Sequence, residues 1–234
     1  MEETMKTEQR VMTACLGAIL LLLNVSYAGP IASSTFDTGN EGWLVVSTEG
    51  YVGPANWSPT GGNPGGYIYD TDMDNGGWGF LAPSKFLGDV SAAYGQTLTF
   101  DFTGDRIEHE YAGVALANTT GIGIITHVAL PDYPGHIASR EIVLDASQEW
   151  YVFNYNTGDE GGLATNAEIQ ATLSDLAYLF LGAEFAPGFD NDGEYEYGEF
   201  VAYDNIILVP EPGAILLFSL GALFIPKRRK LQTG

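Results

Sequence analysis

The acidic side chains of this sequence are its clearest candidates for chemistry, because they can bind a cation. The chain has 30 Asp and Glu residues against 9 Lys and Arg, and its formal net charge is −21. Calcium prefers such carboxylate oxygens together with backbone carbonyls. The stretch 70–74 places Asp at alternate positions, as an EF-hand loop does at its start, but Asn75 and Leu81 replace the glycine and the glutamate that this loop requires. A second acidic stretch, 190–194, is equally well explained as a solvated hairpin turn.

Another candidate calcium site joins the two ends of the predicted domain. Jelly-roll carbohydrate-binding modules often open with Phe followed by Asp or Glu and then Gly-Trp, and close with Asp-Asn or Asp-Asp. Phe36-Asp37, Gly42-Trp43 and Asp204-Asn205 resemble this pattern. The resemblance implies a structural calcium between Asp37 and Asp204. The alternative is that these two aspartates only cap turns.

Catalytic groups are harder to find. His109, His127 and His136 lie in unrelated contexts without the spacing of metal ligands, and no serine stands in a Gly-x-Ser-x-Gly nucleophile motif. A glycosidase needs only two carboxylates beside the bond that it cleaves. Because this sequence has so many carboxylates, their presence does not distinguish a glycosidase from a protein without activity. We therefore predict that the protein is not an enzyme, and an enzyme acting on polysaccharide is the weaker alternative.

Aromatic side chains offer a second kind of site, because a flat ring packs against the C–H groups of a sugar. Trp57 lies in a stretch rich in Gly and Pro, near Tyr51 and Asn56. We predict that these three residues bind a ligand. The alternative for Trp57 is a loop anchor that packs on the sandwich, while Trp78 and Trp150 are predicted to be core residues.

The distribution of charge excludes one class of partner. The basic residues are concentrated at the two ends of the chain, so the middle is strongly acidic. Binding of nucleic acid needs clustered Lys and Arg to neutralise phosphates, and we exclude it. The one cysteine, Cys15, lies in the N-terminal apolar run, so the predicted domain can form no internal disulfide.

Residues 1–28 are predicted to be a secretory signal peptide. Basic residues precede an apolar run over 11–25, which closes with Ser26-Tyr27-Ala28, small residues at the two positions that a signal peptidase recognises. The run is shorter than the ~20 residues that a membrane-spanning helix needs. Cleavage is expected after this triplet, and an uncleaved anchor is the alternative.

Residues 209–234 contain a Pro-Glu-Pro motif, an apolar run and a basic cluster, with the key residues Pro210, Glu211, Pro212, Lys227, Arg228, Arg229 and Lys230. This order resembles the PEP-CTERM sorting signal of Gram-negative bacteria, in which the motif precedes a short transmembrane helix and a basic cluster. In that family an exosortase in the inner membrane cuts near the motif and releases the protein toward the cell surface or exopolysaccharide. The basic cluster is expected to stay cytoplasmic while the acidic domain is exported. A plain C-terminal anchor or a last buried strand is the alternative.

Short strands must position the candidate side chains. Strict alternation of apolar and polar residues over 97–102 predicts a half-buried strand. Further strands are predicted over 31–37, 43–46, 67–69, 111–117, 121–128, 137–144, 150–155, 178–185 and 199–208. Residues 50–66 are rich in Gly, Pro and Asn and are predicted to be loop. Repeated short strands at this spacing predict an antiparallel β-sandwich, so the fold class is all-β.

One helix is predicted near 166–176. Thr165 and Glu168 have the spacing of a capping box, and Ile169, Leu173 and Leu176 fall on one face at helical spacing. We expect this helix to cover an end of the sandwich.

The stretch 78–98 contains a motif formed by Trp78, Phe80, Ala82-Pro83, Lys85-Phe86-Leu87-Gly88, Tyr94-Gly95 and Leu98. An aromatic pair, Ala-Pro, Lys-Phe-Leu-Gly and Tyr-Gly before a strand also form the pattern of the laminin B domain, called laminin IV type A as well, which the stretch resembles. A weaker likeness extends over about 65–208, and the resemblance implies a jelly-roll, galactose-binding-like sandwich of a kind found in extracellular matrix proteins.

Three parts are therefore predicted: a signal peptide over 1–28, a laminin B-like domain over 29–208 and a sorting signal over 209–234. We expect an exported protein of the cell surface or matrix, processed by signal peptidase and exosortase while it is transiently at the inner membrane. Its predicted function is non-catalytic binding of exopolysaccharide or another matrix component. A structural matrix protein without a defined ligand is the main alternative.

Overall fold

The computed structural model describes residues 29–72, 77–107, 109, 111–184 and 199–209, which all belong to one compact unit. The predicted signal peptide and all of the sorting signal after Val209 lie outside the described residues, as do the acidic stretch 190–194 and Asp74. Among the helices of the described part, none is long and apolar enough to cross a membrane.

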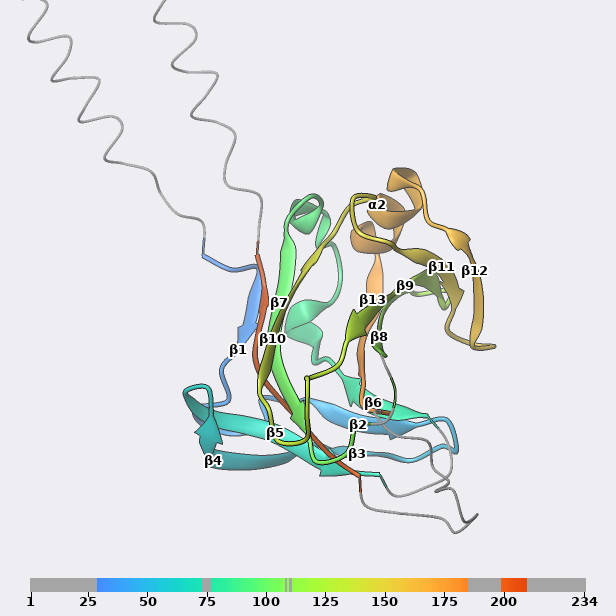
Figure 1. The fold of residues 1–234 in the computed structure, drawn as a ribbon. Helices are drawn as coiled ribbons and strands as arrows, with labels where there is room; N and C mark the ends of the chain where they lie inside the picture. Colours follow the sequence, from blue (N-terminus) through green and yellow to red (C-terminus); the bar gives the residue numbers. More distant parts are fainter. Residues whose placement is uncertain (1–28, 73–76, 108, 110, 185–198, 210–234) are drawn as a thin grey trace, which may run out of the picture. The chain divides into compact units, whose positions relative to one another are not determined.

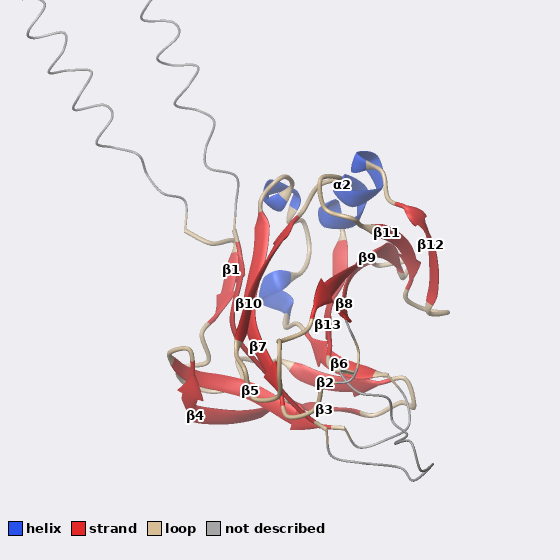
Figure 2. Cartoon of the chain, viewed as in Figure 1, coloured by secondary structure: helices blue, strands red, loops and turns tan. Residues whose placement is uncertain are grey.

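Two antiparallel sheets pack face to face (Figure 1). The six-stranded sheet runs β10 (Ala138–Val143), β7 (Thr97–Gly104), β14 (Phe200–Leu208), β5 (Gly65–Thr71) and β4 (Asn56–Gly62), with β1 (Ala32–Ser34) also paired to β14. The eight-stranded sheet runs β12 (Asp159–Leu163), β11 (Tyr151–Asn154), β9 (Ile122–Ala129), β8 (Tyr111–Asn118), β13 (Leu176–Gly182), β6 (Trp78–Leu81), β2 (Leu44–Ser47) and β3 (Val52–Pro54). The predicted all-β antiparallel sandwich is confirmed, and Figure 2 shows how little of the described chain is helical.

Strand β7 shows why alternation produces this architecture. Leu98, Phe100 and Phe102 are each 1% exposed, because every second side chain of a strand points into the space between the sheets. The residues between them face the other way, and Asp101 is one of these. The residues of β7 that alternate with these core residues therefore form the outer face of the sheet.

Tyr203 of β14 connects the two sheets through the core. Its side chain is fully buried among Phe80, Phe100 and Phe102, with ring centroids 5.3, 5.6 and 5.7 Å away. Its hydroxyl donates a hydrogen bond to the carbonyl of Gly182 in β13, at 2.6 Å. Burial raises the pKa of this phenol, so the hydroxyl keeps its proton and its role as a donor.

The stretch 78–98 forms β6, two short 3₁₀ helices (Ser84–Phe86 and Ser91–Ala93) and the start of β7. Its aromatic residues Trp78, Phe80 and Phe86 are all buried, and Trp150 is also buried, so the predicted core tryptophans are confirmed. Backbone hydrogen bonds join the stretch to the residues around the helix, including one from the amide of Val90 to the carbonyl of Leu173, at 2.8 Å.

The helix α2 (Asn166–Ser174) confirms the predicted capping box. Thr165 accepts a hydrogen bond from the amide of Glu168, and the Glu168 carboxylate accepts one from the amide of Thr165. Ile169 and Leu173 are buried as expected, whereas Leu176 belongs to β13 because the chain leaves helical geometry one residue earlier.

The prediction that 50–66 is loop was wrong, because β3, β4 and the first residues of β5 lie there. Both β3 and β4 are edge strands, where a proline needs no partner for its missing amide proton. Pro54 and Pro59 are accommodated in this way. Strand β12, which contains two glycines and is exposed along its whole length, is a third edge strand that the hydrophobic pattern did not indicate.

The first and last strands of the domain lie side by side (Figure 1). Strand β1 pairs antiparallel with the end of β14, with Ala32 opposite Leu208. The amide of Ile31 also donates to the carbonyl of Leu208, at 2.8 Å. The two ends of the described domain therefore leave it at one corner.

Candidate functional site

The outer face of the eight-stranded sheet carries a group of rings that we call the aromatic strip. It consists of Tyr151, Phe153, Tyr155, Tyr178 and Phe180. In β13 the two strip residues are only half-buried, while Leu179 and Leu181, which alternate with them, are buried in the core. In β11, Val152 packs against the core and its two neighbours therefore face outward.

The rings of the aromatic strip contact one another across strands. Tyr155 and Tyr178 are stacked, with centroids 4.8 Å apart and planes inclined by 9°. Phe180 and Phe153 each meet Tyr155 edge to face, at 6.5 and 6.4 Å. Burial raises the pKa of the Tyr155 hydroxyl, and the neighbouring Tyr178 raises it further, so the Tyr155 hydroxyl keeps its proton.

Small, buried residues lie next to the aromatic strip. Ala115, Ala117 and Gly123 are its neighbours on the strands between β13 and β11, and the larger Ile125 stands opposite Tyr151. Gly79 on β6 lies so close to Phe180 that an added Cβ would be 2.6 Å from that ring. In Figure 1 the sheet is curved, with β11 and β12 at one end and β2 and β3 at the other.

Polar and apolar groups border the aromatic strip. His127 lies 6.1 Å from the ring of Tyr151, and its Nε2 is 3.5 Å from a carboxylate oxygen of Glu160. Leu163, opposite Tyr151 in the strand pairing, is 64% exposed. The arrangement can pack against flat apolar faces and offer hydrogen bonds at its border.

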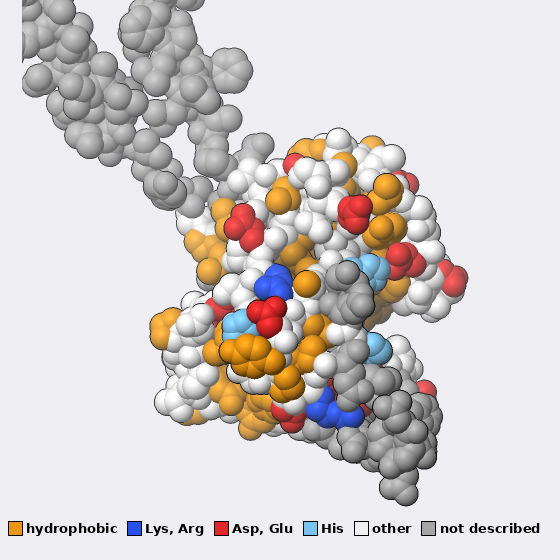
Figure 3. Space-filling model, viewed as in Figure 1, with side chains coloured by type: hydrophobic (Ala, Val, Ile, Leu, Met, Phe, Trp, Pro, Cys, Tyr) orange, Lys and Arg blue, Asp and Glu red, His pale blue; other side chains and the backbone are white. Residues whose placement is uncertain are grey.

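A separate pocket lies on the outer face of the six-stranded sheet. Its volume is about 430 Å³. Its floor and walls comprise Gly61, Gly62, Asn63, Tyr67, Asp101, Phe102, Thr103, Gly104, Asp105, Pro134, Gly135, Ile137, Phe200, Ala202, Tyr203 and Asp204. We call this the sheet pocket. Figure 3 shows few Lys or Arg atoms on the face in view, as the acidic composition leads one to expect.

Two aspartates of the sheet pocket face each other across neighbouring strands. Asp101 of β7 is directly opposite Asp204 of β14, and the two side chains are 8% and 4% exposed. The strand pairing shifts immediately after Asp204, and Asn205 adopts a positive φ of 50° at this bulge. The Asn205 amide nitrogen thereby donates to Asp101 at 2.8 Å and lies 3.4 Å from Asp204.

The pKa of Asp204 is raised, first by burial and then by the negative charges of Asp101 and Asp37. Hydrogen bonds from the backbone amides of Asn63 and Asn205 oppose this increase. The carboxylate is therefore well hydrogen-bonded and at the same time close to two like charges.

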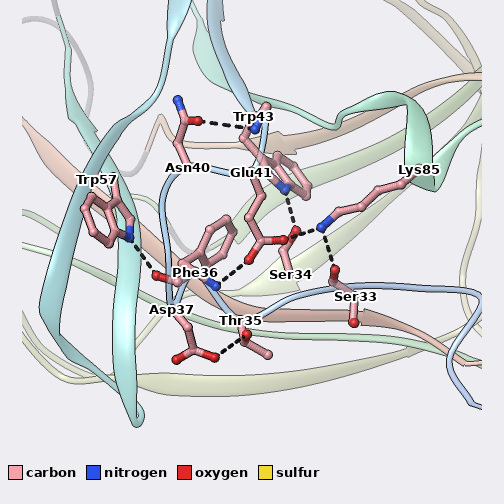
Figure 4. Close-up of polar contacts among 11 residues, drawn as sticks. Ser33, Ser34, Thr35, Phe36, Asp37, Asn40, Glu41, Trp43, Trp57 and Lys85 are labelled. Atoms are coloured by element: carbon pink, nitrogen blue, oxygen red, sulfur yellow. Dashed lines mark hydrogen bonds and ion pairs between the residues drawn. The ribbon is translucent and has the colours of Figure 1, made fainter.

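The predicted calcium pair Asp37 and Asp204 lies close enough for their charges to interact. Asp37 accepts a hydrogen bond from the hydroxyl of Thr35 at 2.8 Å, as drawn in Figure 4, and its other oxygen lies beside Gly65. The described residues form no group of three or more His, Cys, Asp or Glu arranged to hold a metal ion. Calcium at this pair stays a prediction.

The predicted sugar-binding residues lie on two different sheets. Asn56 and Trp57 belong to β4, whereas Tyr51 precedes β3 at the edge of the other sheet. The indole nitrogen of Trp57 donates to the carbonyl of Phe36 at 2.6 Å (Figure 4), and the ring packs partly against the core. Asn56 hydrogen-bonds the carboxylate of Asp70, and Tyr51 is 39% exposed.

Neither the aromatic strip nor the sheet pocket was predicted from the sequence, although Asp204 of the pocket is one of the two predicted calcium ligands. The alternation Tyr178-Leu179-Phe180-Leu181 shows that aromatic residues occupy the face of β13 opposite to the core. Their meeting with Tyr155 depends on strand order, which no local pattern reveals. Asp101 likewise meets Asp204 only through pairing between residues far apart in the chain.

In architectural class, the protein is an all-β module: an antiparallel sandwich of two sheets with one short α-helix. Residues 79–192 match the Laminin B (Domain IV) family. Laminin subunit gamma-1 of Danio rerio is 33% identical over 109 residues, which cover 44% of this chain and 6% of that protein. Laminin subunit gamma-2 of Homo sapiens is 32% identical over 74 residues, 32% of this chain and 6% of that protein. The chain thus contains a laminin B (Domain IV)-like domain and matches only a small part of each relative.

One of two similar solved structures supports this fold. The L4b domain of human laminin alpha-2 has a TM-score of 0.52 at 15% identity, covering 77% of this chain and 98% of that domain. A family 11 carbohydrate-binding module of a Clostridium thermocellum cellulosomal cellulase has a TM-score of 0.42 at 18% identity, covering 76% and 95% of the two chains. The second value is too low to support an inference, and the first supports the fold alone.

Proposed function

We propose that the domain is a non-catalytic binding module that holds a polysaccharide chain along the aromatic strip. One observation carries the proposal: the outward face of the eight-stranded sheet presents clustered rings where a solvated sheet face ordinarily presents polar residues. Rings on a curved face suit a flat, repeating ligand, because sugar C–H groups pack on them and hydroxyls reach polar neighbours. A laminin B-like sandwich is a suitable scaffold but does not specify a ligand.

The proposed setting is the cell surface or the extracellular matrix. The signal-peptide pattern of 1–28 and the Pro-Glu-Pro, apolar and basic order of 209–234 support export across the inner membrane, with cleavage by signal peptidase and an exosortase. The ligand is then the exopolysaccharide that the same cells release, or another matrix glycan.

The test is an affinity measurement with purified protein and the host exopolysaccharide, supported by a glycan array. Tyr178→Ala is expected to weaken binding roughly two- to tenfold, because one aromatic contact contributes about 0.5–1.5 kcal/mol. Tyr133→Ala is the matched control, since this tyrosine is 61% exposed and outside the aromatic strip. Melting curves check that each variant is folded.

The outcomes separate the remaining candidates. Polysaccharide binding that is equal in wild type and Tyr178→Ala but lost in Trp57→Ala would move the site to the edge strand β4. Self-association without affinity for any glycan would favour a structural matrix protein. Turnover of the exopolysaccharide would show an enzyme.

A further inference from the structure

The sheet pocket is a second candidate site, and it consists of different residues from the aromatic strip. Its floor belongs to the neighbouring strands β7, β14 and β5, which are paired on both sides and therefore rigid. The loops around 61–63 and 134–137 form its walls. A pocket of about 430 Å³ on such a floor can hold a small organic group rather than only an ion or a water molecule.

The charge of the sheet pocket is negative and unbalanced. Asp101, Asp105 and Asp204 line it, and among the described lining residues none is Lys, Arg or His. The hydrogen-bond donors that reach Asp101 are the amides of Asn63 and Asn205 and the hydroxyl of Ser139, all of which are neutral. Like charges directly opposite each other on adjacent strands repel, so a cation between them would be stabilised.

The side-chain amide of Asn205 lies beside both carboxylates. Its amide nitrogen donates to Asp101 and to the carbonyl of Asn63, and it lies near Asp204. This donor is neutral and Asn205 does not line the sheet pocket, so the negative charge of Asp101 and Asp204 on the pocket side stays uncompensated. An ammonium group presents the same kind of donor with a full positive charge.

The rest of the sheet pocket is apolar and includes one polar atom with no partner. Tyr67 and Phe200 lie on either side of Tyr69 in a row of tilted rings, with centroids 5.6 and 5.5 Å apart, and Ile137 at the border is 40% exposed. The buried hydroxyl oxygen of Thr103 has no hydrogen-bond partner among the described atoms. A ligand with an apolar body and a polar end would suit the lining that Tyr67, Phe200, Ile137 and Thr103 provide.

We propose that the sheet pocket binds an organic ammonium group carried on an apolar or sugar ring, with Asp101 and Asp204 facing the nitrogen. The ammonium comes either from a free amine or from an amino sugar within a polysaccharide. This site is independent of the aromatic strip, so either proposal can fail without the other.

The test uses three ring compounds of one size and different charge: benzylamine, benzyl alcohol and benzoate. Titration calorimetry on the purified full chain is expected to show binding of benzylamine, at least about tenfold weaker binding of benzyl alcohol, and none of benzoate. Asp204→Asn is expected to remove the preference for the amine. Asp89→Asn, an exposed aspartate outside the pocket, is the matched control.

A second variant keeps the proposal testable if Asp204→Asn unfolds. Ile137→Lys leaves both carboxylates in place and puts a positive charge at the border of the pocket, so benzylamine affinity is expected to fall about tenfold or more. Equal binding of the three compounds, or benzylamine affinity unchanged in Ile137→Lys, would overturn the proposal. Calcium binding by wild type without any benzylamine binding would assign the two carboxylates to the metal instead.

The source of the ammonium is distinguished by a second pair of probes. Chitosan oligosaccharides carry free amines, and chitin oligosaccharides carry the same rings with acetylated nitrogen. Tighter binding of chitosan than of benzylamine, retained in Tyr178→Ala, would identify an amino sugar. Weaker binding of chitosan than of benzylamine would identify a free amine.

Discussion

Replacing Tyr203 by phenylalanine tests whether its hydroxyl holds the two sheets together. The variant keeps the ring and its contacts with Phe80, Phe100 and Phe102, and removes only the 2.6 Å hydrogen bond to the carbonyl of Gly182. Because both partners are buried, the free energy of unfolding is expected to fall by about 1–3 kcal/mol. For a domain of this size, that corresponds to a melting temperature lower by roughly 2–12 °C.

Urea unfolding of wild type, Tyr203→Phe and Tyr203→Leu measures this loss. Tyr203→Leu is expected to lose more, because it also removes the ring from the aromatic core. Tyr133→Phe is the control, since its hydroxyl belongs to an exposed side chain. A change of less than about 0.3 kcal/mol in Tyr203→Phe, or an equal loss in the control, would refute the reasoning.

Four further predictions concern the helix, the aspartates and the chain ends. Thr165→Ala removes half of the capping box and is expected to lower the free energy of unfolding by about 1 kcal/mol, measured by urea unfolding. Folding raises the pKa of Asp204, by burial and by the charges of Asp101 and Asp37, so its contribution to stability is complete below its ordinary pKa and is lost as pH rises through the raised value. The melting temperature of Asp204→Asn relative to wild type is therefore expected to be higher at neutral pH than at about pH 3.5, and a pH-independent difference would contradict this. If calcium binds between Asp37 and Asp204, excess calcium stabilises by about 3 kcal/mol at a hundredfold excess over Kd, and identical melting curves in calcium and in chelator would exclude it. Mass spectrometry of protein recovered from the cell surface is expected to show a chain without residues 227–230, whereas an intact basic tail would argue against exosortase processing.

The elements that sequence reasoning predicted correctly are those with strong local patterns. The strict alternation over 97–102 became the central strand β7, and the capping box of Thr165 and Glu168 became the start of α2. These patterns are reliable because burial on one face and capping at one end depend on residues near each other in sequence.

The strands that were not predicted from the sequence have compositions that make sense only from their position in the sheets. Strands β3, β4 and β12 lie at sheet edges, where glycine and proline are tolerated and the hydrophobic signal is weak. The two candidate sites were missed for a related reason. The opposition of Asp101 to Asp204 and the stacking of Tyr155 on Tyr178 join residues whose meeting is decided by strand order and not by neighbouring sequence.

The pairing of β1 with the end of β14 determines how the domain responds to mechanical force. Both ends of the domain leave from the same corner, so tension between residues 29 and 209 would act first on the hydrogen bond between Ile31 and Leu208. The remaining pairs of the three-residue strand β1 would then break one after another, as in unzipping, instead of sharing the load in shear. A domain attached through one end only never experiences this tension. Under the proposed function, tension on a bound polymer would act on the eight-stranded sheet, whereas β1 and β14 belong to the six-stranded sheet, so this corner would lie outside the loaded strands.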